Sequence, residues 1–262
     1  MMSALAGSWE CDLEEALGRA RREGLLDSLA RVYAEFPEVT CDNCARCCFE
    51  SPGVFFVEYL DTLHMIADLP TDRRRHLLRG AVRELFFSWI EPDRTCIFLG
   101  PSGCNIYHQR PLACRLFGLV APAEREQAEV EARLAARQEA QRLRLLGIEV
   151  PEAVIRRSLV SCDRVRNMRG EPVRADADAI AVRVADLDAA LLPRQVVAEE
   201  FCFQSVAERL GAAAFMPEVV EKMRVQLLRR AQRGESVEEL VDLVWRQARF
   251  PGVVGVESGD RP

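Results

Sequence analysis

The run CDNCARCC at residues 41–48 constrains the fold of this 262-residue chain more than any other feature. It places four thiols close together, at Cys41, Cys44, Cys47 and Cys48. A second group follows in CIFLGPSGCNIYHQRPLACR, at Cys96, Cys104 and Cys114. Seven of the ten cysteines therefore lie in two short windows, and thiols clustered in this way are typical of a metal site rather than of a packed core.

The spacing of the first group fits two kinds of metal centre. A Cys-x2-Cys pair can turn both sulfurs toward one ion, and it is the usual half of a zinc knuckle. A Cys-x2-Cys-x2-Cys run supplies three thiolates to a cubane iron–sulfur cluster, and Cys41, Cys44 and Cys47 have this spacing. Because adjacent side chains diverge, we expect Cys47 and Cys48 to serve two neighbouring metals, or one of them not to be a ligand.

Composition and charge limit the kind of protein. Apolar residues make up 49% of the chain and charged residues 29%, which is typical of a folded globular protein. The net charge of −6 argues against nucleic-acid binding, and no apolar stretch is long enough to span a membrane. The N-terminus lacks the apolar segment of a signal peptide, so we expect a cytoplasmic protein with reduced thiols. The dominance of arginine over lysine and the abundance of alanine are typical of a GC-rich bacterial genome.

Apolar periodicity and turn residues predict a mainly α-helical protein around a small cysteine-rich core. We expect an N-terminal helix within residues 1–37, a metal-binding domain at 38–120 and a helical region at 121–262. The predicted helices cover residues 10–35, 58–68, 71–89, 122–146, 151–168, 176–191, 194–210 and 217–233, and a last helix has a capping box at Ser236 and Glu239. The runs 96–99 and 104–107 predict a short β-hairpin, and residues 252–262 a loose tail.

Neighbours of the two cysteine groups are further candidates for the site. Cys162 would make an eighth thiol, enough for two four-thiolate sites, and it is equally consistent with a small buried residue. Arginines that would balance the negative charge of a thiolate centre are Arg46, Arg110 and Arg115. We expect Tyr107 to frame the centre, whereas His108 is a weaker candidate for a nitrogen ligand. Two isolated cysteines fit small buried residues: Cys11 and Cys202.

Taken together, the two groups resemble the CxxCxxCC cysteine-cluster (YkgJ-like) family, whose domain is described as zinc- or iron-chelating. The family pattern is a CxxCxxCC run, a cysteine before an apolar triplet, and Cys-x-Ile-Tyr-x-x-Arg-Pro-x-x-Cys-Arg. Every position is present here, as Cys41, Cys44, Cys47, Cys48, Cys96, Cys104, Ile106, Tyr107, Arg110, Pro111, Cys114 and Arg115. The resemblance covers residues 38–118 and implies a metal-chelating domain with no defined reaction.

These features lead to two hypotheses. In the first, favoured by the triple Cys-x2 spacing and the surplus of thiols, the chain holds an iron–sulfur cluster or iron. Its fourth thiolate would come from the second cysteine group, and the cluster would serve redox chemistry, electron transfer or modification of a macromolecule. In the second, tetrahedral thiolate sites hold zinc and stabilise a scaffold that binds another protein. No motif identifies a reaction, so the sequence leaves open whether the protein is an enzyme.

Overall fold

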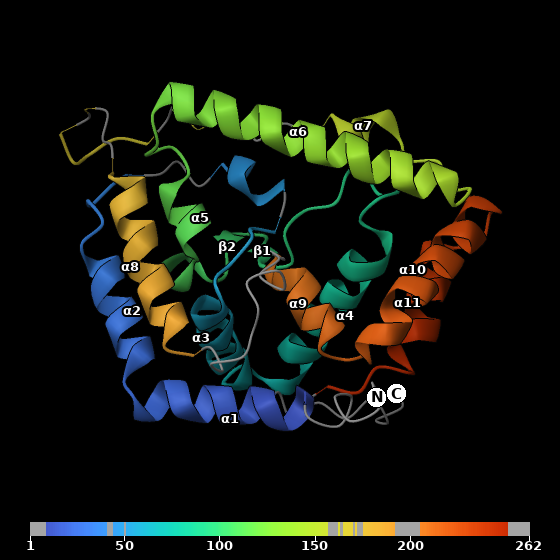
Figure 1. Ribbon diagram of the computed structural model, residues 1–262, viewed down its shortest axis with the longest axis horizontal. Coiled ribbons are helices and arrows are strands. Elements are labelled where there is room, and N and C mark those ends of the chain that lie inside the picture. Colours follow the sequence, from blue (N-terminus) through green and yellow to red (C-terminus); the bar gives the residue numbers. More distant parts are fainter. Residues whose placement is uncertain are drawn as a thin grey trace.

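A computed structural model describes residues 9–40, 44–49, 51–156, 162, 165–169, 171, 175–191 and 205–250. Within them the protein is mainly α-helical with one short β-hairpin, as the sequence predicts (Figure 1). The helices are α1 (Trp9–Arg22), α2 (Leu25–Ala34), α3 (Phe56–Ala67), α4 (Thr71–Phe87), α5 (Leu112–Leu116), α6 (Pro122–Leu145), α7 (Glu152–Ile155), α8 (Ala177–Ala189), α9 (Val206–Ala212), α10 (Pro217–Gln232) and α11 (Val237–Trp245). The 3₁₀ helices are η1 (Arg46–Phe49) and η2 (Tyr107–Gln109).

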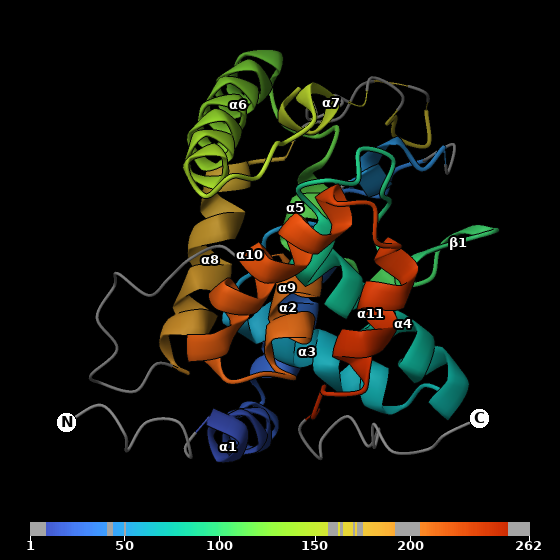
Figure 2. The same cartoon turned by 90° about the vertical axis from the view of Figure 1, so that its right-hand side faces the viewer.

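The hairpin is shorter than the sequence predicts. β1 (Leu99–Gly100) pairs antiparallel with β2 (Gly103–Cys104), and Leu99 lies opposite Cys104. Figure 2 shows this hairpin projecting from the helical body. The residues after β2 form η2 instead of continuing the strand, so Cys104 stands at the point where the hairpin returns to the body.

Two predicted helices differ from the structure. The helix predicted at 10–35 is two helices, because Gly24 adopts a left-handed φ of 67° and turns the chain between α1 and α2. The helix predicted at 151–168 is present only as the short α7, which ends at Ile155, and residues 157–161, 163 and 164 lie outside the described residues. Beyond it, Arg166 forms an isolated antiparallel bridge with Thr40, so pairing with a distant segment replaces helix there.

The remaining secondary-structure predictions have mixed outcomes. Residues 192–204 and the tail at 252–262 lie outside the described residues. The helix predicted at 194–210 does not run through Ser205, which is extended and is the N-cap from which α9 begins. Ser236 is the N-cap of α11, but its side chain accepts no capping hydrogen bond. A capping box forms instead at α9, where Glu208 N donates to Ser205 Oγ over 3.1 Å and Ser205 N donates to Glu208 Oε2 over 3.1 Å. None of the described helices combines the length and apolar composition that crossing a bilayer requires.

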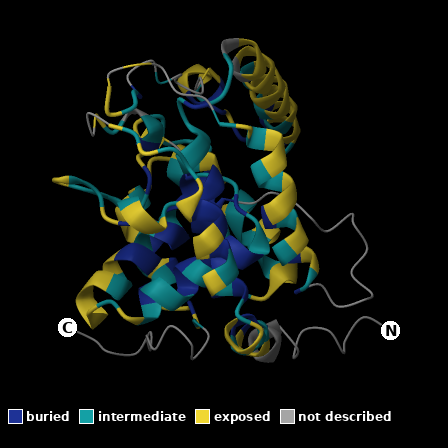
Figure 3. Ribbon diagram, turned by 90° about the vertical axis from the view of Figure 1, so that its left-hand side faces the viewer, coloured by how far each residue is buried: buried dark blue, intermediate teal, exposed yellow. Residues whose placement is uncertain are grey.

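Among the described residues, two hydrophobic clusters form the core, and α4 contributes to both. The first half of α4, including Leu78 and Ala81, packs with α1, α2, α3, α8 and α9. The second half, including Phe86 and Phe87, packs with the end of α6 and with α7, α10 and α11. Figure 3 shows the buried residues gathered in the interior. Because Cys48 and Cys96 belong to the first cluster, the cysteine segments are built into the core.

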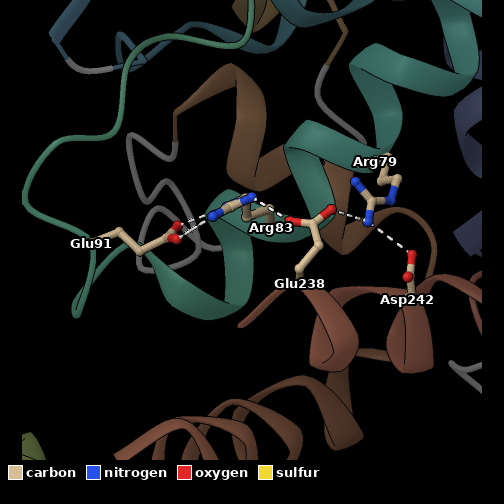
Figure 4. A network of polar contacts seen from close by, with 5 residues as sticks. All are labelled: Arg79, Arg83, Glu91, Glu238 and Asp242. Carbon is tan, nitrogen blue, oxygen red and sulfur yellow. Dashed lines mark hydrogen bonds and ion pairs between the residues drawn. The ribbon is translucent and has the colours of Figure 1, made fainter. Parts of the chain in front are cut away.

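Ion pairs fix α11 against α4 at the protein surface (Figure 4). Arg79 pairs with Glu238 and, over 2.8 Å, with Asp242. Arg83 pairs with Glu238 over 2.8 Å and with Glu91 over 2.6 Å. Glu238 therefore joins two arginines of α4, and this network links α11 to α4.

Candidate metal centre

Cysteines from separate segments line one cavity beside the first core cluster. They are Cys44, Cys47, Cys48, Cys96, Cys104, Cys114 and Cys162. They come from the loop before η1, from η1, from the loop before β1, from β2, from α5 and from the segment after α7. Six of the seven predicted ligands therefore share this cavity, and the seventh, Cys41, lies outside the described residues. The side chain of Arg46 also lies outside them.

Backbone hydrogen bonds join the two cysteine windows directly. Cys96 N donates to Cys48 O over 2.7 Å, and Cys48 N donates to Ala45 O over 2.9 Å. Ala45 has a φ of 58°, the left-handed region that alanine adopts at a cost of about 1–2 kcal/mol. The turn that gathers Cys44 and Cys47 is therefore held in a strained conformation, which is common at binding sites.

The thiols differ in their readiness to ionise. A hydrogen bond from the Cys48 thiol lowers the pKa of Cys47 to about 6, and the same bond raises the pKa of Cys48. Burial raises the pKa of Cys96 to about 12 and also raises the pKa of Cys104 and Cys114. Cys47 is therefore the most readily ionised thiol of these five. Thiolates are the form that binds metal, so we expect Cys47 to bind a metal more readily than the other four thiols.

Two predicted arginines shape the wall of the cavity. Arg110 lines it with its guanidinium carbon 4.1 Å from the centre of the Tyr107 ring, and its Nε is buried without a hydrogen-bond partner in the described structure. Arg115 donates from Nε to Arg110 O over 2.8 Å and from Nη2 to His108 O. The guanidinium carbon of Arg115 lies 4.2 Å from the centre of the Tyr33 ring. His108 is exposed and is absent from the described lining of the cavity.

Sequence reasoning missed Glu58, a buried carboxylate that holds the second cysteine window. Only 3% of Glu58 is exposed, and it accepts hydrogen bonds from Tyr33 Oη, from Phe55 N over 2.9 Å and from Leu112 N over 2.5 Å. Burial and the charge of Glu58 raise the pKa of Tyr33, so its hydroxyl remains a donor. Leu112 is the first residue of α5, so its hydrogen bond to Glu58 positions the helix that carries Cys114. No local sequence signal marks Glu58, because two of its donors, Tyr33 and Leu112, come from distant parts of the chain.

Glu84 on α4 has a similar role for the other cysteine segments, and no sequence motif marks it either. Ser51 Oγ donates to Glu84 Oε2 over 3.0 Å, and Arg94 Nη1 lies 2.8 Å from Glu84 Oε1. Ser51 Oγ also lies 4.0 Å from the Cys96 sulfur. Because Ser51 follows Cys48 closely and Arg94 precedes Cys96, one buried carboxylate anchors both segments to α4.

Cys162 reaches the cavity because two contacts hold its segment. Thr40 N, next to the first cysteine window, donates to Arg166 O over 2.8 Å. Gly118 packs against the segment so closely that an added Cβ would lie 3.1 Å from Cys162 Cβ and 2.7 Å from Val165 Cγ2. Gly118 also has a left-handed φ of 90°, which glycine adopts without strain. The structure therefore brings to the cavity a cysteine that the sequence left undecided.

The donors suit a thiophilic metal, since cysteine thiolates select zinc and iron–sulfur clusters. Within the described part of the chain, no three cysteine, histidine or carboxylate side chains are already placed to hold one ion. The shared cavity therefore collects the donors without forming a complete ligand set among these residues.

Comparison with known families agrees with this site. Residues 40–136 match the model of the CxxCxxCC family, described as a putative zinc- or iron-chelating domain. The match confirms the resemblance of the two cysteine groups, covers just over a third of the chain and ends before Cys162. It supports metal binding and does not distinguish zinc from iron. No curated protein and no solved structure matches the chain significantly.

Proposed function

We propose that the chain holds a polynuclear iron–sulfur centre in the cysteine cavity and uses it in a redox reaction with another protein. The observation that carries this proposal is the convergence of seven described cysteines on a single cavity. Two zinc knuckles would need two separate sets of four ligands. A cluster takes its thiolates around one volume, which is the arrangement that these segments favour.

The size of the cavity supports more than a single ion. Its free volume is about 60 Å³. One water molecule needs about 10–15 Å³ of such free volume. The space therefore suits a centre of several atoms, with Cys41, Cys44 and Cys47 supplying three thiolates and the other cavity cysteines the remainder.

Charge around the cavity supports an anionic centre. Arg110 lines the cavity, and its buried Nε has no hydrogen-bond partner among the described residues. Arg115 lines it as well and fixes the carbonyl of Arg110. Two guanidinium groups beside a thiolate centre offset its negative charge and raise its reduction potential.

The exposure of the cavity rim favours electron exchange with a partner. Cys44, which lines the cavity, is exposed. An iron–sulfur cluster supplies one-electron transfer, and a ligand at the surface brings it within reach of a docked protein. The role of the chain's own residues is to bind the cluster, to hold it at the rim and to compensate its charge.

The proposal is tested by anaerobic reconstitution with ferrous iron and sulfide, followed by absorption and electron paramagnetic resonance of the reduced protein. The expected result is a cluster signal in the wild type and in Cys11→Ser, a control on α1 to which we assign no metal role. The signal should be lost in Cys47→Ser and Cys96→Ser. Tight zinc binding without any cluster signal would contradict the proposal and would favour a zinc-stabilised protein-binding scaffold.

A further inference from the structure

The helix α6 has one side packed on the protein and an opposite side open to solvent. Ala140 and Leu143, near its C-terminal end, are buried in the second core cluster. Val130 and Leu134 are 57% and 56% exposed. At 3.6 residues per turn, these two lie about 140–180° around the helix from Leu143 and about 80–120° from Ala140. Figure 1 shows α6 along the edge of the molecule, and most of this helix has the colour of exposed residues in Figure 3.

Charge along α6 changes sign near its middle. The acidic residues of the first half are Glu124, Glu126, Glu129 and Glu131, with Arg125 as the exception. The basic residues of the second half are Arg133, Arg137, Arg142 and Arg144, with Glu139 as the exception. Two copies of such a helix repel when parallel and attract when antiparallel, so the pattern is complementary to itself.

Some charged residues of α6 make no ion pair among the described residues, and two of them are placed to pair with a second copy of the chain. Most arginines of α6 have an acidic partner: Arg133 with Glu129, Arg142 with Glu139 and Glu221, and Arg144 with Glu149. Across the described residues, exposed Glu126 and exposed Arg137 make no ion pair. Both lie within about 40° of Val130 around the helix, on the edge of the exposed apolar stripe nearer the buried Ala140, where Arg137 also lines a hollow with Ile155 and Arg156.

We propose that the chain forms a homodimer in which the outward sides of two α6 helices pack antiparallel, with the twofold axis between Val130 and Leu134. Val130 of each copy packs on Leu134 of the other copy. At 1.5 Å per residue, Glu126 lies about 9 Å to one side of the axis and Arg137 about 7.5 Å to the other. Each Glu126 therefore comes opposite Arg137 of the second copy, and the symmetry forms this ion pair twice.

Sedimentation equilibrium of the full chain in the micromolar range, with reductant to prevent intermolecular disulfides, tests the proposal. The wild type should approach twice the chain mass of 29.5 kDa. Glu126→Arg and Arg137→Glu should each weaken the dimer about tenfold, because each places two like-charge pairs in the interface. The double variant Glu126→Arg/Arg137→Glu should restore wild-type affinity, and Leu134→Glu should leave monomer.

The control is Glu239→Arg, an exposed charge reversal on α11 that should leave the dimer unchanged. Circular dichroism reports whether each variant is folded. A wild type that stays monomeric, or a dimer that neither single reversal weakens, would overturn the proposal. So would a double variant no tighter than the single variants. The interface does not involve the cysteine cavity, so dimerisation should be the same with and without metal.

Discussion

Replacing Gly118 with alanine should move Cys162 out of the cavity without altering any cysteine. An added Cβ would lie 3.1 Å from both Cys162 Cβ and Cys162 O, and 2.7 Å from Val165 Cγ2. Favourable carbon–carbon separations are about 3.5–4.0 Å, so these contacts must open by roughly 0.5–1 Å. Since one of the clashing atoms is a backbone oxygen, the segment itself has to shift.

The matched control is Gly147→Ala. Gly147 has a φ of 77°, close to the 90° of Gly118, and nothing lies within 4 Å of an added Cβ. Both variants should lose about 1–2 kcal/mol of unfolding free energy from the left-handed alanine. Gly118→Ala should lose about 1–3 kcal/mol more from overpacking.

Urea unfolding measures the stabilities, and timed alkylation followed by mass spectrometry reads the accessibility of each thiol in anaerobically purified protein. Cys162 should react in Gly118→Ala as fast as in the metal-free wild type, and it should stay protected in Gly147→Ala. Equal stability losses in the two variants would refute the close packing of Gly118. A fully protected Cys162 in Gly118→Ala, with unchanged metal content, would refute the role of this packing in metal binding.

Three further substitutions test the supports of the site and fold. Ala45→Gly should raise the unfolding free energy of the metal-free protein by about 0.5–1 kcal/mol in urea, because glycine relieves the left-handed strain; a decrease would contradict that strain. Glu58→Gln should lower the unfolding free energy by about 1–3 kcal/mol, because an amide cannot accept every hydrogen bond that the carboxylate accepts from Tyr33, Phe55 and Leu112. An unchanged urea midpoint would count against this network. Asp188 on α8 is 3% exposed and accepts a hydrogen bond from Val57 N over 2.6 Å. Asp188→Asn should be stabilising in urea at neutral pH, because the amide oxygen can keep this bond and burial raises the pKa of the native carboxyl. The native carboxyl then keeps its proton to a higher pH than the unfolded one, so the wild type loses stability as pH rises through the raised pKa. The gain of the variant should grow over that range, and parallel pH profiles would contradict the raised pKa.

The sequence predicted the parts of the site that depend on local spacing. The Cys-x2 repeats, the hairpin turn between Gly100 and Gly103 and the helical periodicity all act over a few residues, so they are visible without a fold. The long helix at 122–146 and the helix at 176–191 were also predicted closely, because each has clear start and stop signals.

Features that depend on distant segments could not be predicted. Glu58 and Glu84 were indistinguishable from ordinary helical glutamates, because their donors come from remote parts of the chain. The helix predicted at 151–168 failed for a similar reason, since the bridge between Thr40 and Arg166 joins segments far apart in sequence. Whether Cys162 reaches the cavity depends on its packing against Gly118, which no local pattern records.

Elemental analysis, together with acid-labile sulfide, tests the central claim most directly. The protein should be purified without oxygen and without metal-affinity resin, so that the metal measured is the one acquired in the cell. An iron–sulfur centre in the cysteine cavity requires several iron atoms per chain with a matching amount of sulfide. One or two zinc ions per chain, with neither iron nor sulfide, would contradict it.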